Sequence, residues 1–239
     1  MDLDLDLNLG DIGLDAEIDL SGFSVDIEGA GLNFSTRYAK PPIFKGIPDR
    51  LVMIENAEKL AAQIGIERGM RIHCIVSGDF IFGDFIEALM TTHKVKAKRM
   101  VINTLSCSQH NIDSLAALAK GGYIERLDLL VSVYFYGHNR KGLIPYIYKT
   151  LDIPELDFQL GVSDCHCKTT TIETPKGGCI VLHGSANLRS SKCLEQFCIE
   201  ENRELLEFHN AVSDRILEVY GTIQKPIRTA AKTWEAVCR

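Results

Sequence analysis

The chain has 239 residues, of which 46% are hydrophobic and 24% are charged, and its formal net charge is −6. This length and composition suit one substantial globular domain with an additional tail. No run reaches the roughly 18 apolar residues that indicate a membrane-spanning helix. The first residues are acidic and lack the basic segment of a secretory signal peptide, so we expect a cytoplasmic protein without a membrane partner.

The charge is distributed unevenly along the chain. Residues 1–31 contain nine acids and no lysine or arginine, which leaves 23 acids against 26 bases in residues 32–239. The first segment alternates acidic and aliphatic residues and is interrupted by glycines, which is typical of low-complexity sequence. We expect residues 1–36 to be an acidic tail that is mobile or forms strands only in an assembly. The alternatives are that it binds the protein's own active face or a partner.

Residues 37–49 contain three prolines and are expected to link the tail to the body. From residue 50 onward, helical and strand-like patterns alternate. The expected helices cover 55–64, 84–92, a segment capped by Ser108 or Asn111 that ends at Lys120, 142–150 and 201–220. The expected strands cover 70–77, 99–105, 127–136, 158–174 and 178–183, the last two joined by a turn at 174–178.

The last of these helices has an apolar face composed of Leu205, Phe208, Val212, Ile216 and Val219. It is followed by a basic C-terminal segment, residues 225–239. Strands separated by helical crossovers predict an α/β domain over residues 50–224, with a layered sheet flanked by helices.

The residues with the clearest chemistry lie in the second half of the chain. His166 and Lys168 are separated by one residue, and Ser185 and Asn187 follow a glycine further on. Because side chains alternate along a strand, each pair is expected to share one face. If the two runs form a hairpin, an imidazole, an ammonium, a hydroxyl and an amide converge. Such a set suits an anionic tetrahedral group such as a phosphodiester.

The same residues resemble the signature of the phospholipase D superfamily, which is His-x-Lys, an acid, Gly-Ser-x-Asn and a glutamate. Here it reads His166-Cys167-Lys168, Glu173, Gly184-Ser185-Ala186-Asn187 and Glu195. The full-length pattern is also similar to phospholipase D-like proteins of prophages and bacteria. The resemblance implies a phospholipase D-like fold and a phosphodiesterase that needs neither a metal nor another cofactor.

The resemblance also implies a double displacement. His166 attacks phosphorus to form a phosphohistidine, and a second His166 protonates the leaving oxygen and then activates water. The chain carries one copy of the motif, so the second histidine is expected from the other subunit of a homodimer. Lys168 neutralises the non-bridging oxygens, Ser185 and Asn187 donate hydrogen bonds, and Glu195 fixes the tautomer of a histidine.

Other polar residues near the motif have alternative roles. Glu195 follows Gly-Ser-x-Asn after a short interval, and Glu200 and Glu201 are alternatives for its role. Glu173 stands where the family usually has aspartate, at a mostly structural position. His183 shares a face with the motif serine by alternation, but a structural role is favoured.

Three basic residues are weaker candidates for substrate binding. Arg140 and Lys141 follow the long strand in a turn-rich segment, and Arg189 follows Gly-Ser-x-Asn. A role as solvated surface residues is favoured for them, with contacts to flanking phosphates as the alternative. The mildly basic body favours nucleic acid over lipid as the substrate.

The cysteines raise the question of a zinc site. Cys165 and Cys167 flank His166, but alternation turns both thiols away from it, and zinc favours C-x2-C spacings. We therefore expect no metal at the site, and reduced thiols throughout.

The sequence thus predicts a homodimeric phosphodiesterase, a nuclease rather than a phospholipase. The alternatives are a non-catalytic phospholipase D-like protein that binds nucleic acid or a partner, and an unrelated α/β domain that carries the motif by chance.

Overall fold

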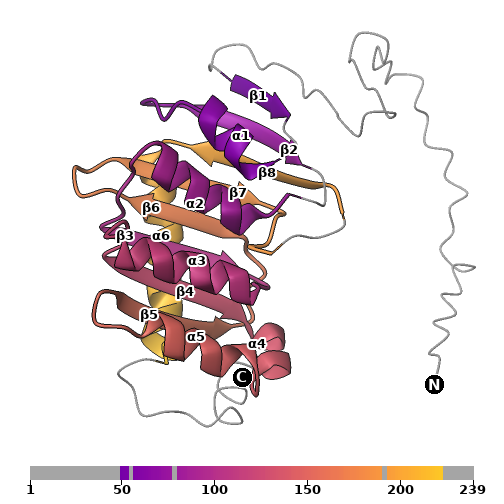
Figure 1. The fold of residues 1–239 in the computed structure, drawn as a ribbon, viewed down its shortest axis with the longest axis vertical. Helices are drawn as coiled ribbons and strands as arrows, with labels where there is room; N and C mark the ends of the chain where they lie inside the picture. The colour runs from indigo at the N-terminus through magenta and orange to yellow at the C-terminus, as the bar shows by residue number, and fades with distance from the viewer. Residues whose placement is uncertain (1–48, 54–55, 77–79, 190–192, 223–239) are drawn as a thin grey trace, which may run out of the picture.

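The computed structural model describes residues 49–53, 56–76, 80–189 and 193–222. These ranges form one sheet of eight strands with six helices (Figure 1). Among the helices described, none combines the length and the apolar character needed to cross a membrane. The expected acidic tail, nearly all of the linker and the basic C-terminal segment lie outside the described residues.

The elements alternate along the chain as expected. The strands are β1 (Asp49–Met53), β2 (Arg71–Val76), β3 (Arg99–Thr104), β4 (Arg126–Ser132), β5 (Asp157–Ser163), β6 (Thr169–Glu173), β7 (Cys179–Gly184) and β8 (Glu195–Glu200). The helices are α1 (Ala57–Gln63), α2 (Phe82–Thr92), α3 (Gln109–Lys120), α4 (Val133–Asn139), α5 (Leu143–Leu151) and α6 (Arg203–Tyr220).

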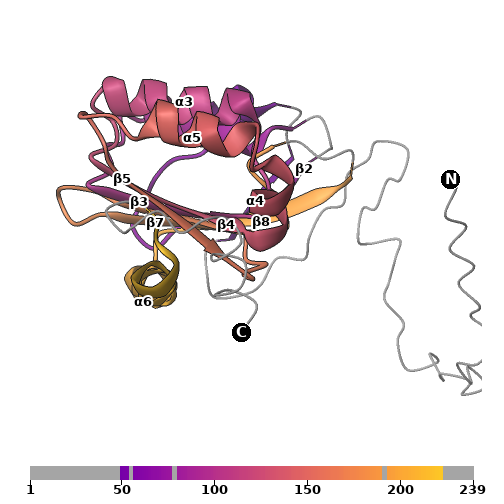
Figure 2. The same ribbon diagram turned by 90° about the horizontal axis from the view of Figure 1, so that it is seen from below.

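The sheet is mixed, with the strand order β1-β2-β8-β7-β6-β3-β4-β5. Strands β6 and β8 run antiparallel to their neighbours, while β1–β2 and β3–β4–β5 are parallel. Helices α1, α2, α3 and α5 cover one face, and α6 lies on the other (Figures 1 and 2). The expected α/β class, a layered sheet flanked by helices, is confirmed.

One edge of this sheet collects the polar motif. Strands β2, β3, β4, β5 and β7 end there, and β6 and β8 begin there, as the pairings require. We call this the site edge. It contains Thr104, Ser132, Ser163, Gly184 and Glu195.

A cluster of four phenylalanine rings supports this edge from the main core. Phe82 and Phe85 of α2 pack against Phe197 of β8, with ring centroids 5.0 and 5.4 Å apart, and Phe80 joins them at 5.9 Å from Phe197. All four side chains are buried. Burial of aromatic surface stabilises the fold strongly, so α2 fixes the position of β8 where the strand begins.

The expected strand over 127–136 is wrong beyond Ser132. Strand β4 ends there, and the next residues form α4. The Ser132 side chain accepts a hydrogen bond from the Phe135 backbone N–H at 3.1 Å. This serine N-cap starts a helix in spite of the β-branched and aromatic residues that follow it.

The expected continuous strand over 158–174 is also wrong, because residues 164–168 form a loop. The reason is topological. Strand β5 is the outermost strand of the sheet, beside β4, whereas β6 lies between β3 and β7. The chain must therefore cross the ends of β4 and β3 before it can continue. Strand β8 was not expected at all.

Helix α6 uses a different face from the expected one. Leu206, Asn210, Ser213 and Leu217 are buried against the sheet, whereas Phe208 is 63% exposed. The sheet offers polar partners: the Thr171 hydroxyl donates to Asn210 at 2.6 Å, and the Asn103 amide donates to Ser213 at 3.2 Å. Of the other residues expected on the apolar face, Leu205 and Ile216 are half-buried and Val212 is exposed. The side chain of Val219 is outside the part that the structure describes.

Arg99 provides a test of how α6 is held. Its guanidinium contacts the carboxylate of Asp128 at 2.7 Å and that of Asp214 on α6, and Asp128 is fully buried. Arg99→Ala removes one of the two arginines that contact the buried Asp128 carboxylate, the other being Arg126 at 3.2 Å, and also the contact with Asp214, so the free energy of unfolding should fall by about 3 kcal/mol. Urea denaturation measures this loss. Asp157→Ala, which breaks an exposed pair with Arg126, should cost less than about 1 kcal/mol; equal losses would contradict this account.

Candidate active site

The loop that joins β5 to β6 carries the histidine and the lysine. His166 is exposed and Lys168 is half-buried. The Lys168 Nζ atom lies 3.4 Å from both His166 Nδ1 and the His166 carbonyl oxygen. The two side chains therefore meet, as expected, although they do so in a loop and not on a strand. The alternation argument for the flanking thiols of Cys165 and Cys167 does not apply for the same reason, because side chains alternate regularly only along a strand.

Pairing between β6 and β7 places this loop beside the Gly-Ser-x-Asn segment. Thr169 lies opposite His183, and the Gly184 backbone N–H donates to the Lys168 carbonyl at 3.2 Å. The expected hairpin is thus confirmed. It brings Lys168 next to the residue that precedes Ser185.

Ser185 is held against the start of β8. Its backbone N–H donates to the Gln196 carbonyl at 2.8 Å, and the Gln196 N–H donates to Ser185 Oγ at 3.0 Å. The Ser185 hydroxyl donates to the Glu195 carboxylate. The structure therefore joins the predicted serine and the predicted glutamate directly. One contact of Glu195 is thus with this hydroxyl, and the expected contact with a histidine of a second subunit stays a prediction.

Asn187 fastens its loop to the end of β3. Its Oδ1 atom accepts a hydrogen bond from the Leu105 N–H at 3.1 Å and lies 3.5 Å from Thr104 Oγ1. The Thr104 oxygen also accepts from the Leu188 N–H at 3.3 Å. With the carbonyl side of the amide occupied, the Nδ2 side is the part that can donate to an anion. Sequence reasoning missed Thr104, a polar residue at the end of an apolar strand.

A cleft of about 500 Å³ opens beside His166. Arg189 lies on its wall, together with Tyr134 of α4 and Leu105 at the end of β3. The other lining residues are Ser106, Ser132, Val133, Phe135, Asn139, Asp164 and Cys165. Helices α3 and α4 begin at this edge, so the positive ends of their dipoles favour a bound anion.

The remaining basic candidates lie outside the cleft lining. Arg140 caps the C-terminal end of α4, Lys141 follows it, and both are exposed. Neither belongs to the cleft lining, whereas Asn139 of the same helix does. A substrate longer than the cleft is needed to reach them.

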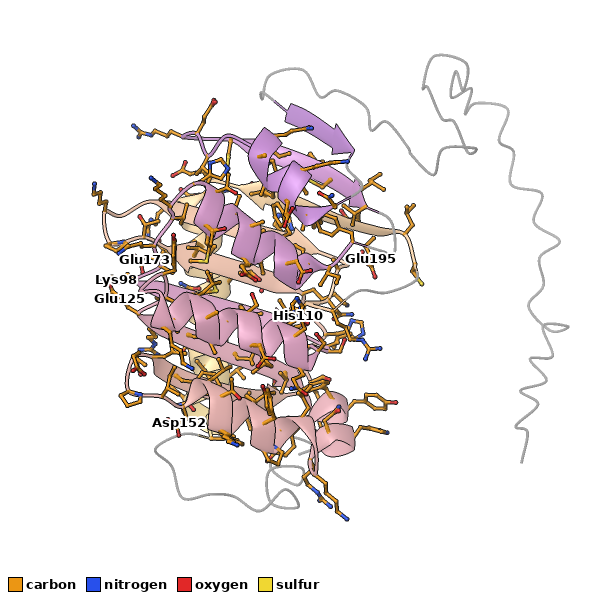
Figure 3. All side chains as sticks on the ribbon, in the orientation of Figure 1. Lys98, His110, Glu125, Asp152, Glu173 and Glu195 are labelled. Carbon is orange, nitrogen blue, oxygen red and sulfur yellow. The ribbon has the colours of Figure 1, made fainter. Side chains whose placement is uncertain are left out.

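The other acidic candidates lie away from the site edge. Glu173 forms an ion pair with Arg203 at 3.1 Å. Figure 3 shows Glu173 on the side of the sheet opposite Glu195 along the direction of the strands. Glu200 and Glu201 lie at the far end of β8, beyond the reach of Ser185. Glu201 accepts a hydrogen bond from the Gly69 N–H at 2.8 Å. Neither is placed to take the role of Glu195.

His183 has a structural partner, as favoured from the sequence. Its Nε2 atom lies 3.0 Å from Glu200 Oε1, and its ring lies 6.4 Å from that of His209 on α6. Burial opposes ionisation of Glu200, but hydrogen bonds from His183 and Arg71 outweigh it and lower the pKa of this carboxyl.

Comparison with known proteins gives likenesses in fold. No protein-family model and no curated protein sequence matches the chain. Polyphosphate kinase from Porphyromonas gingivalis is similar over 66% of this chain, with 14% identity and a TM-score of 0.46. The match covers 27% of the kinase, so this chain corresponds to about a quarter of that protein's length.

Two further solved structures are similar over more of their own length. Nuc from Salmonella typhimurium, a phospholipase D family member, matches 53% of this chain and 81% of its own, with 16% identity and a TM-score of 0.40. NucT from Helicobacter pylori matches 62% of this chain and 97% of its own, with 16% identity and a TM-score of 0.44. At these identities and TM-scores, nothing about activity follows from the likeness.

Gly184 provides a test of how the site is positioned. A Cβ atom there would lie 2.2 Å from the Gln196 carbonyl oxygen and 2.6 Å from the Phe197 Cα. Gly184→Ala should therefore separate β7 from β8 and lower the free energy of unfolding by about 3 kcal/mol, as measured by urea denaturation.

The matched control for this variant is Gly142→Ala, because a Cβ atom at Gly142 meets nothing within 4 Å. The control should change stability by about 0.5 kcal/mol or less. A Gly184→Ala variant as stable as this control would show that the close approach of the two strands is not required.

Proposed function

We propose that this chain is a phospholipase D-like phosphodiesterase that works without a metal and forms a phosphohistidine on His166. The observation that carries the proposal is the contact between Lys168 Nζ and His166 Nδ1 at 3.4 Å, beside a cleft and next to the Gly-Ser-x-Asn loop. A nucleophilic imidazole, a fixed positive charge and hydroxyl and amide donors are what phosphoryl transfer needs.

In the proposed first step, the ring nitrogen of His166 that carries no proton attacks phosphorus, the nitrogen–phosphorus bond forms and the bond to the leaving oxygen breaks. Lys168 and the Asn187 Nδ2 group stabilise the charge on the non-bridging oxygens. The second step reverses this order: water attacks phosphorus and the nitrogen–phosphorus bond breaks. On the side of phosphorus opposite His166, the second histidine protonates the leaving oxygen in the first step and takes a proton from the attacking water in the second.

We propose that the second histidine comes from a second copy of this chain, in a two-fold homodimer. The support is the exposure of two large apolar side chains beside the motif. Tyr134, which lines the cleft, is 70% exposed, and Leu194, just before Glu195, is 60% exposed. Apolar side chains around a half-complete site suit a subunit contact.

Nucleic acid is the proposed substrate. Arg189 lies in the cleft wall, and Arg140 and Lys141 are exposed at the end of a helix that lines the cleft. A single-stranded or double-stranded polyanion extends far enough to contact all three, whereas a single headgroup does not. Arg189→Ala should weaken DNA binding and reduce its salt dependence, as measured by fluorescence anisotropy over a range of salt concentrations. An unchanged salt dependence would remove Arg189 from the binding face.

Hydrolysis of bis(p-nitrophenyl) phosphate in EDTA tests the activity. The wild type should turn over, His166→Asn should lose at least about a thousandfold in rate, and Lys168→Ala should lose about a hundredfold or more. His110→Asn, which changes an exposed histidine of α3 outside the cleft lining, is the matched control. Activity that needs an added metal, or that survives His166→Asn, would contradict the proposal.

Mixed dimers test the shared site. When wild-type and His166→Asn chains exchange subunits freely, a site that uses a histidine from each subunit retains activity only in wild-type pairs. Activity per total chain should then fall with the square of the wild-type fraction. Separate sites predict a linear fall.

A further inference from the structure

A second group of chemically active side chains lies on the sheet face that α6 covers, away from the His166 loop. His73 of β2, Cys198 of β8 and His183 of β7 lie directly opposite one another across three neighbouring strands. Arg71 and Glu200 form the next such pair on β2 and β8. Residues opposite one another in antiparallel strands share a face, so all five side chains gather on one surface.

Three of these residues already surround a common point. An atom each of His183, Cys198 and Glu200, namely Nε2 or Nδ1, Sγ and a carboxylate oxygen, lie within 4.8 Å of one another. Glu200 Oε1 is the shared atom, 3.0 Å from His183 Nε2 and 3.7 Å from Cys198 Sγ. Cys198 and Glu200 are buried, and His183 is half-buried, so an ion could enter from the histidine side.

Arg71 orients the carboxylate through its second oxygen. Its guanidinium contacts Glu200 Oε2 at 2.9 Å, which leaves Oε1 directed at the histidine and the thiol. A carboxylate that is fixed by a second partner is a better ligand, because its orientation is already set. A thiolate together with this carboxylate also outweighs the single positive charge of Arg71.

We propose that His183, Cys198 and Glu200 bind a thiophilic divalent cation such as Zn²⁺, with His73 or His209 as a fourth ligand. Nitrogen, sulfur and oxygen donors in a group of three or four suit zinc, which prefers four ligands at about 2.0 to 2.3 Å. Small side-chain rotations are needed to reach these distances. Binding replaces the Cys198 thiol proton, which goes to solvent, while His183 binds through a ring nitrogen that carries no proton and keeps its N–H on the other nitrogen.

The ion connects β7 and β8 with either a third strand or a helix, and it takes no part in the proposed reaction. Its ligands come from β7 and β8, with β2 or α6 supplying the fourth, and they face α6 while His166 lies in a loop at the site edge. His183 stands immediately before the Gly-Ser-x-Asn segment, so a bound ion holds β7 and β8 together where that segment begins. The site is therefore structural, and its existence does not depend on the proposed phosphodiesterase activity.

Titration of the full chain with Co²⁺ tests the site through absorbance. We expect one ion per chain, with a thiolate-to-cobalt charge-transfer band, and displacement of Co²⁺ by Zn²⁺. Cys198→Ser should remove the band and weaken binding at least tenfold. The matched control is Cys179→Ser, because Cys179 is also buried and lies in β7 on the same face of the sheet. It should leave the charge-transfer band and the affinity unchanged.

The half-buried thiol of Cys165 and the exposed thiol of Cys167 are the competing ligands, so the titration is repeated with both changed to serine. A band that disappears in that variant, a band that survives Cys198→Ser, or no stoichiometric binding to the wild type overturns the proposal. His183→Gln changes a half-buried side chain and provides the same test if Cys198→Ser does not fold. Its expected result is at least tenfold weaker binding with normal circular dichroism.

Discussion

The close approach of β7 to β8 at Gly184 is the constraint on which the rest of the site depends. A side chain at this position would overlap the backbone of Gln196 and Phe197. Its absence allows Ser185 to exchange backbone and hydroxyl hydrogen bonds with Gln196 and to donate to Glu195. The phenylalanine cluster around Phe197 supports the same point from the core, so aromatic packing and motif geometry are coupled.

The crossing of the chain from β5 to β6 is the second determinant. Because these strands are separated by β4 and β3, the loop that joins them must pass over the ends of both. This route places His166 above residues that follow β3 and β4 and creates the cleft. A lysine in the same loop then lies beside Gly184 through a single backbone hydrogen bond. The histidine is positioned by topology and the serine by strand pairing, and both lie at the site edge.

The sequence predicted the alternation of strands and helices, the hairpin of β6 and β7 and the pairing of His166 with Lys168. It failed where a local signal was overridden. Ser132 starts a helix inside an apolar run, and the strand expected over 158–174 breaks because its halves belong to different parts of the sheet. The buried face of α6 could not be predicted, because its polar residues find partners on β3 and β6, such as Asn103 and Thr171. Long-range pairing of this kind leaves no periodic pattern.

The central claim, that His166 is the nucleophile, is tested most directly by trapping the covalent intermediate. A phosphodiester substrate with a slow second step is mixed with the protein, the reaction is quenched at alkaline pH, and the peptides are mapped by mass spectrometry. The account predicts a phosphoryl adduct on His166 that forms and decays at rates consistent with turnover. Turnover without any adduct, or an adduct on another residue, would contradict it.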